Sequence, residues 1–185
     1  LRGQTAVYVD SQAAGKSRFD SVVLGTPIGS DSEGLEVFAD LFRRANIKPY
    51  FADDIDAFLL THAAMVVPLS AALYQVDADV YELASDKHLL NDTVNAVKEA
   101  LERLRRRGFA LEPRSYRWMR FFPTGLIRMQ FRRTLASPFG EIGLAAHAKV
   151  ARKEMEALAR GLIERTKTSG VRAPRLERLI EGLRE

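Results

Sequence analysis

The sequence predicts a mainly α-helical protein that begins with a short α/β segment. Residues 1–53 hold short β-branched and aromatic runs separated by glycine and proline, a pattern typical of strands and turns. From residue 54 onward, apolar residues recur three and four positions apart, as in amphipathic helices. The 185 residues are 46% hydrophobic, which is enough for one domain with a small appendage. We therefore expect an α/β domain over residues 1–53 and a helical domain over residues 54–185.

The α/β segment is predicted to contain strands at residues 5–9, 19–24 and 48–52. Polar residues at 30–32 can cap a helix whose apolar stripe runs through residues 35–42. A strand–helix–strand connection favours a right-handed crossover and a parallel pair of strands. Because so few short strands make a poor isolated sheet, we expect them to extend a larger sheet, and we expect the chain to be a piece of a longer protein.

Capping signals divide the helical domain into segments. Helices are predicted to begin near Asp54, Asp86, Pro113, Pro123, Gly143 and Pro174. Gly108 and Gly170 are expected to end two of them, and the last long helix is predicted to run from about residue 143 to 168. Pro68 is expected to kink the first helix or to begin a new one, because proline lacks the amide hydrogen that an inner helical turn uses.

Composition and spacing exclude several kinds of site. The chain has no cysteine, so disulfides, thiolate nucleophiles and cysteine zinc sites are excluded. Gly25 and Gly29 lie between a predicted strand and a helix, but they form neither a Gly-x-Gly pair nor a P-loop, so we interpret them as an ordinary turn. No serine–histidine–aspartate arrangement can be assigned, and no metal site is predicted.

The sequence favours a cytoplasmic location. Residues 1–20 are polar and mixed in sign, so no signal peptide is predicted. The longest apolar stretch, residues 57–74, is interrupted by polar residues and a proline, and it falls short of the roughly 18 apolar residues of a spanning helix. The absence of cysteine fits a reducing compartment. We therefore expect no membrane partner.

Among the histidines, His62 is the candidate site residue. It falls in an apolar helix, seven residues after Ile55 and so on nearly the same face. A titratable group at such a position is either a satisfied core histidine or a site residue, and the sequence leaves both interpretations open. His88 and His147 are expected to be surface or cap residues.

Residues 114–133 form a basic and aromatic stretch. Four of its arginines fall where helices would align them: Arg114, Arg117, Arg120 and Arg128. A positive stripe of this kind suits phosphate, an anionic membrane or a nucleic acid. The alternative is an amphipathic helix whose aromatic rings lie in the core while its arginines extend to solvent. The net charge of the chain is only +4, which favours the alternative, so a nucleic-acid partner is not expected.

Two groups of motifs, one in each half of the chain, carry a resemblance to a known family. The first is Val23-Leu24-Gly25, a helix, a strand, and then Asp54-Ile55 with Leu59 opening an apolar helix. The second is Glu154, then Leu162-Ile163, Gly170-Val171 and Pro174 with Leu176 and Leu179. In this order, over nearly the whole chain, the motifs resemble the ketopantoate reductase family.

The resemblance implies a Rossmann domain that binds NADPH, followed by an all-helical 6-phosphogluconate-dehydrogenase-like domain that binds substrate and pairs into a homodimer. The chain would hold the last strands of the first domain and all of the second. The implied activity is an oxidoreductase step of pantothenate biosynthesis, the reduction of an α-keto acid, with NADPH bound by Rossmann residues outside this chain. The resemblance places His62 at the family's catalytic lysine, and Ser70 and Glu154 at substrate-binding positions.

Several positions depart from the family pattern. His62 stands where the family has its lysine, Leu60 where it has tryptophan, and Val66 and Ser70 where it has two asparagines. A histidine with an ordinary pKa near 6.5 is mostly neutral at pH 7, unlike a lysine. One hypothesis is therefore a divergent reductase in which His62 is the acid. The alternative is a non-catalytic binding or assembly module that kept the fold but lost the lysine, and a third is anion binding through residues 114–133.

Overall fold

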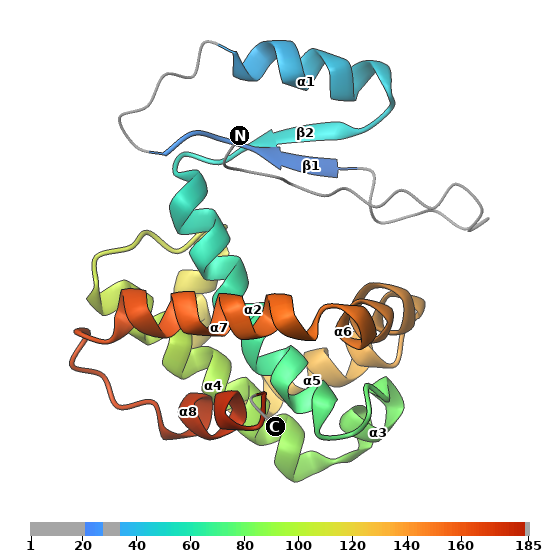
Figure 1. Cartoon of the computed structure of the whole chain (residues 1–185), viewed down its shortest axis with the longest axis vertical. Coiled ribbons are helices and arrows are strands. Elements are labelled where there is room, and N and C mark those ends of the chain that lie inside the picture. The colour runs from blue at the N-terminus through green and yellow to red at the C-terminus, as the bar shows by residue number, and fades with distance from the viewer. Residues whose placement is uncertain (1–20, 28–33, 184–185) are drawn as a thin grey trace. The chain divides into compact units, whose positions relative to one another are not determined.

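The computed structural model describes residues 21–27 and 34–183, and Figure 1 shows that helices make up most of them. The prediction of a mainly helical protein is therefore confirmed. The chain divides into two compact units, Leu1–Asp56 and Ala57–Glu185. The division falls between residues 56 and 57, three residues after the boundary predicted between residues 53 and 54.

The N-terminal unit contains a parallel strand–helix–strand element, as predicted. Strand β1 (Ser21–Leu24) pairs in parallel with β2 (Lys48–Phe51), and helix α1 (Leu35–Arg44) connects them. All four residues of each strand have a partner in the other strand. The strand predicted at residues 5–9 and the polar residues predicted to cap α1 lie outside the described residues.

Helix α1 buries little of its apolar surface within the described part of the unit. Ala39 and Val22 form the small core, with at most 4% of either residue exposed. The side chains of Val37, Phe38 and Leu41 remain more than half exposed. An uncovered apolar face of this size usually belongs to an interface. It is the surface expected if the strands and helix extend a larger sheet.

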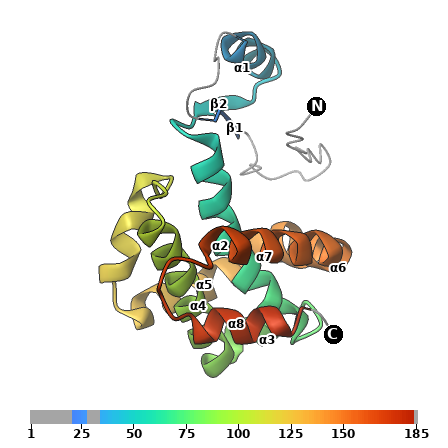
Figure 2. The same ribbon diagram turned by 60° about the vertical axis from the view of Figure 1, so that its left-hand side comes forward.

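The helical unit is built around helix α4, which packs against η1 and against helices α3, α5 and α8 (Figure 2). The α-helices are α2 (Ile55–Tyr74), α3 (Val80–Ser85), α4 (Lys87–Arg106), α5 (Thr124–Leu135), α6 (Ala146–Val150), α7 (Arg152–Thr166) and α8 (Pro174–Glu181). Two other helical segments are η1 (Arg114–Phe121), a 3₁₀ helix, and η2 (Gly140–Ala145), a π-helix. Fully buried leucines from α3, α4, α7 and α8 meet in one core cluster.

Short-range capping signals set the ends of the long helices, as predicted. The Asp86 carboxylate accepts hydrogen bonds from the backbone N–H groups of His88 and Leu89, both at 2.9 Å, and so caps α4. Gly108 and Gly170 follow α4 and α7 with positive φ angles of 84° and 70°. Glycine adopts this backbone region without the steric cost that a Cβ atom would impose.

The prolines behave differently at helix starts and inside a helix. Pro113 and Pro123 occupy the N-cap positions of η1 and α5, and Pro174 is the first residue of α8. These three positions agree with the predicted helix starts to within one residue. Helix α2 continues past Pro68 as one helix, so of the two outcomes predicted at this proline, a kink or a new helix, the new helix is wrong.

Helix α2 is long and apolar enough to cross a membrane, judged by its length and composition alone. The expectation that this stretch is too polar to do so is therefore wrong. However, 56% of the most apolar 18-residue window is buried inside the structure, as in the core helix of a globular unit. Its Thr61 hydroxyl donates to the Ala57 carbonyl oxygen and accepts from the Glu112 backbone N–H, at 2.7 and 3.2 Å, which joins α2 to the segment before η1.

The single helix predicted over residues 143–168 is wrong, because η2, α6 and α7 divide this region and α6 and α7 meet at Ala151. The Tyr74 hydroxyl donates to the Ala148 carbonyl oxygen at 2.8 Å. In a continuous helix that oxygen would accept from the backbone N–H of Arg152. The Arg152 guanidinium instead lies 5.1 Å from the centre of the Tyr74 ring. The Ala148 oxygen also accepts from the Ala151 backbone N–H at 3.4 Å, so it is shared between a local turn and a contact with α2.

Candidate functional site

The three predicted site residues do not form one cluster among the described contacts. His62 is exposed on α2, where its ring stacks on Phe58 with 6.4 Å between the ring centres. The interpretation of His62 as a core histidine is therefore wrong. Ser70 lies on the same helix and is only 5% exposed. Eight residues of α-helix separate the two by about 12 Å along the axis.

Glu154 lies near the other end of α2. It is an exposed residue in the first turn of α7. The pKa of Tyr74 is raised, first by burial and then by the charges of Glu156 and Glu154, while Arg152 opposes the shift. Tyr74 is one helical turn beyond Ser70, so the structure brings Glu154 toward the Ser70 end of α2 and away from His62.

Of the other histidines and glycines that the sequence singled out, the structure describes His88 and Gly25, while Gly29 lies outside the described residues. His88 is exposed in the first turn of α4, as predicted for a cap or surface residue, while the His147 side chain lies outside the described part. A Cβ atom on Gly25 would come within 3.1 Å of the Ala52 carbonyl oxygen, so this glycine permits a close backbone approach after β1. Within the described residues, no three potential ligands gather around a metal position.

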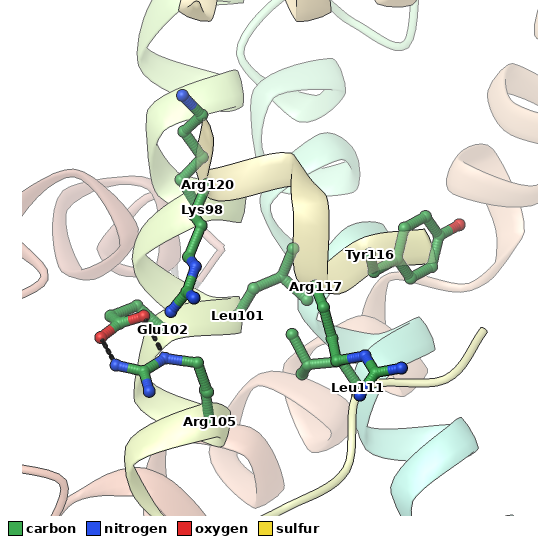
Figure 3. Close-up of a pocket in the computed structure, with 8 residues that line it drawn as sticks. All are labelled: Lys98, Leu101, Glu102, Arg105, Leu111, Tyr116, Arg117 and Arg120. Atoms are coloured by element: carbon green, nitrogen blue, oxygen red, sulfur yellow. Dashed lines mark hydrogen bonds and ion pairs between the residues drawn. The ribbon is translucent and has the colours of Figure 1, made fainter. Parts of the chain in front are cut away.

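A shallow pocket lies between α4 and η1, with room for about 20 Å³ (Figure 3). Its lining is rich in cations and consists of Lys98, Leu101, Glu102, Arg105, Leu111, Tyr116, Arg117 and Arg120. The one carboxylate is already engaged, because Glu102 accepts from Arg105 at 2.7 Å and pairs with Arg106 at 3.3 Å. These bonds hold the pKa of Glu102 below its usual value. The pocket therefore presents a net positive surface.

Burial shifts the pKa values of two residues that line this pocket. Lys98 is half-buried, and this burial lowers its pKa. Its ammonium group donates to the Phe122 carbonyl oxygen at 2.7 Å, which ties α4 to the end of η1. Burial also raises the pKa of the Tyr116 hydroxyl, so this phenol stays neutral at physiological pH. The neutral phenol therefore adds no negative charge to the pocket.

One stripe of α4 positions both η1 and α5. Asn91, Asn95, Lys98, Glu102 and Arg105 recur at spacings of three and four residues, so they lie along one face of the helix. The first three bond to α5 or the residues just before it: Arg128 donates to Asn91 at 3.4 Å and Thr124 to Asn95 at 3.1 Å, while Lys98 bonds to Phe122. The last two line the pocket beside η1. This face of α4 thus fixes the basic stretch at the surface.

We use the name basic–aromatic surface for the arginines and the exposed apolar side chains of η1, α5 and the residues between them. Its arginines are Arg114, Arg117, Arg120, Arg128, Arg132 and Arg133. Its exposed apolar side chains are Trp118, Phe121, Phe122, Leu126 and Met129. The prediction that aromatic rings of this stretch lie in the core is wrong for these residues, because each of the three rings is more than half exposed.

Five of these arginines have no carboxylate partner within the described residues, namely Arg117, Arg120, Arg128, Arg132 and Arg133. Elsewhere in the described part of the helical unit, six arginines pair with acids. Arg175 and Arg178 of α8, for example, bind Asp92 of α4 at 3.3 and 3.5 Å. The side chains of α4 explain why α8 has ion pairs and α5 does not. Asp92 and Glu99 of α4 accept hydrogen bonds from α8, whereas the side of α4 that faces α5 carries Asn91, Asn95 and Lys98.

The spacing of residues along the basic stretch identified its arginines, but it did not reveal that α4 adds Lys98 and Arg105 to the same pocket. Lys98 and Arg105 come from a helix more than ten residues away, and only the folded chain brings them beside Arg117 and Arg120. Their seven-residue spacing, which places them on one helical face, was the available signal.

Comparisons of this chain with known protein families, with curated proteins and with solved structures find no match.

Proposed function

We propose that the helical unit is a non-catalytic module that binds a polyanionic partner through the basic–aromatic surface. The observation that carries this proposal is a set of exposed or half-buried arginines without carboxylate partners that are grouped on η1 and α5. In the rest of the described unit, six arginines form ion pairs, namely Arg103, Arg105, Arg106, Arg160, Arg175 and Arg178. A guanidinium donates in a fixed fork that matches phosphate and carboxylate oxygens. Unneutralised arginines on one surface therefore favour an anion supplied by a partner.

The shape of the surface favours an extended partner over a small molecule. Pockets that enclose small ligands usually measure 300–1,000 Å³. The pocket between α4 and η1 has room for only about 20 Å³, and most of the arginines lie outside it on open surface. A partner that presents many charges across a surface would contact all of them at once.

Removing arginines from this surface is expected to weaken binding to a polyanion. The variant combines Arg117→Ala, Arg120→Ala and Arg128→Ala, and its affinity for fluorescently labelled heparin is measured by anisotropy. Because each cation near an anionic surface contributes on the order of 1 kcal/mol, we expect affinity to fall by about tenfold or more. None of these arginines bonds to a carboxylate, so the fold should persist in circular dichroism.

A matched control removes the same number of charges elsewhere. Arg160→Ala, Lys167→Ala and Arg178→Ala take away three exposed cations that already pair with carboxylates. This control should keep nearly the affinity of the unchanged chain. If both variants lost affinity equally, binding to heparin would depend only on the net charge of the chain. That result would contradict binding through a specific surface.

A second proposed function is the divergent reductase. The parallel β1–α1–β2 unit followed by a helical unit has the element order of the end of a Rossmann domain joined to a 6-phosphogluconate-dehydrogenase-like domain. The uncovered apolar face of α1 supports a larger sheet in the whole protein. NADPH would then bind to that sheet, the helical domains would pair, and an α-keto acid would contact Glu154 and the Ser70 end of α2. His62 lies about 12 Å from Ser70 along the helix axis and is not brought to the same point.

Calorimetric titration of ketopantoate into the chain tests this second function. The reductase hypothesis predicts saturable heat that is lost with Glu154→Gln, because that substitution removes the carboxylate proposed to hold a substrate hydroxyl. Glu154 is exposed at the start of α7, so its replacement should leave the fold intact. Heat that is absent, or that persists in the variant, would contradict the assignment.

A further inference from the structure

The basic–aromatic surface combines its positive charge with unusual apolar exposure. Trp118 and Phe121 are 62% and 63% exposed, and their ring centres lie 5.8 Å apart. The guanidinium of Arg120 lies 4.4 Å from the centre of the Phe121 ring. Leu126 continues the apolar side chains from η1 into α5 and is 52% exposed. Apolar and cationic groups are thus interleaved over two consecutive helical segments.

The aliphatic side chains favour a lipid surface over a nucleic acid. Single-stranded nucleic acids gain affinity by stacking bases on aromatic rings. Leu126 and Met129 offer no stacking plane, yet they lie three residues apart on the exposed side of α5. Aromatic and aliphatic side chains flanked by arginines are the composition of segments that lie in the membrane interface. There the rings occupy the headgroup level and the arginines contact lipid phosphates.

A second copy of this chain does not fit the same surface. A symmetric dimer brings the same patch of two subunits together. The arginines of one copy would then face those of the other, with no acidic residue between positions 113 and 140 to pair with them. Like charges placed opposite each other across an interface are costly. Charge complementarity therefore points to an anionic partner.

We infer that the basic–aromatic surface docks onto the phosphate-rich surface of an anionic lipid bilayer, with Trp118, Phe121 and Phe122 entering the headgroup region. The inference rests on the proposed polyanion binding and names its partner. It differs from a membrane span, because η1 and α5 would lie along the interface and α2 would stay in the core. No membrane partner was expected because the sequence predicted no spanning segment and because the net charge of the chain is small. Neither property describes this local surface.

Trp118 provides a direct readout, because it is the only tryptophan in the chain. Vesicles of phosphatidylcholine alone are compared with vesicles that also contain phosphatidylserine, using the full chain. With the anionic vesicles we expect co-sedimentation and a blue shift of tryptophan emission, and we expect quenching by brominated acyl chains. Neutral vesicles should produce none of these changes.

Substitution of the rings separates insertion from charge attraction. Phe121→Ser with Phe122→Ser should lower partitioning into anionic vesicles by about tenfold or more, because two apolar side chains no longer leave water. Both side chains are more than half exposed, so their loss should not unfold the unit. The matched control replaces exposed apolar residues elsewhere, Val150→Ser and Leu158→Ser, and should partition like the unchanged chain.

The outcomes distinguish this inference from the function on which it rests. Heparin binding together with vesicle binding and a blue shift supports both. Binding to heparin or to a single-stranded oligonucleotide without vesicle binding overturns the lipid inference and leaves polyanion binding in place. Failure to bind heparin, oligonucleotide and vesicles overturns both. Vesicle binding that is unchanged by Phe121→Ser with Phe122→Ser overturns the proposed insertion.

Discussion

Leu104→Ala is expected to lower the free energy of unfolding of the helical unit by about 2–5 kcal/mol. Leu104 is completely buried near the end of α4, in the cluster that α4 shares with α8 and the other helices. Truncation removes the transfer free energy of its methyl and methylene groups and leaves a cavity that packed neighbours only partly fill. Urea denaturation followed by far-ultraviolet circular dichroism measures the change.

Leu158→Ala is the matched control for this prediction. The substitution is the same, but Leu158 is 37% exposed on α7, so we expect a loss below about 1 kcal/mol. Equal losses for the two leucines would contradict the central place given to α4. A change of slope in the denaturant dependence would indicate that the compactness of the folded or unfolded state had changed as well.

The long helices could be predicted because their ends depend on nearby residues. The Asp86 cap and the glycines at positions 108 and 170 act within a few residues of the backbone they affect. The parallel strand pair was likewise predictable from the order of strand, helix and strand. The break at Ala151 was not, since alanine favours helix and the break coincides with a contact from the distant Tyr74 hydroxyl to the Ala148 carbonyl oxygen.

The exposed side of α2 could not be read from periodicity. The helix is apolar around most of its circumference, so no single stripe identifies the buried face. His62 and Ile55 are close to the same face, yet Ile55 is half-buried and His62 exposed. For a helix of this kind, burial follows from which neighbours pack on each turn, and that information is tertiary.

The candidate surface was visible in the sequence, but the net charge of the chain obscured it. Residues 113–140 hold six arginines and no acidic residue, whereas the whole chain has a net charge of only +4. The remaining residues are therefore net negative, so the average hides a concentrated positive segment. The sequence could not show which arginines form ion pairs with carboxylates. Only the fold shows that Asp92 and Glu99 of α4 bind α8, that Glu102 binds arginines of α4 itself, and that the arginines of α5 have no carboxylate partner among the described residues.

Raising the ionic strength from about 0.1 M to about 1 M is expected to weaken binding to anionic vesicles by about 100-fold. Over this range the Debye length falls from about 10 Å to about 3 Å, so exposed arginines lose most of their attraction to lipid phosphates. With each arginine near the surface contributing about 1 kcal/mol, a loss of slightly more than half from five arginines is about 2.8 kcal/mol, which corresponds to that factor. Vesicle co-sedimentation across a sodium chloride series measures it.

The two sets of variants should change this salt series in different ways. The variant without Arg117, Arg120 and Arg128 should bind more weakly and show a flatter dependence on salt, because only half of the six arginines remain to be screened. The variant without Phe121 and Phe122 should bind more weakly at every salt concentration with an unchanged slope, because apolar transfer is not screened. An unchanged slope in the arginine variant would place the electrostatic contact elsewhere on the protein, and a flattened slope in the phenylalanine variant would mean that the rings act by positioning arginines.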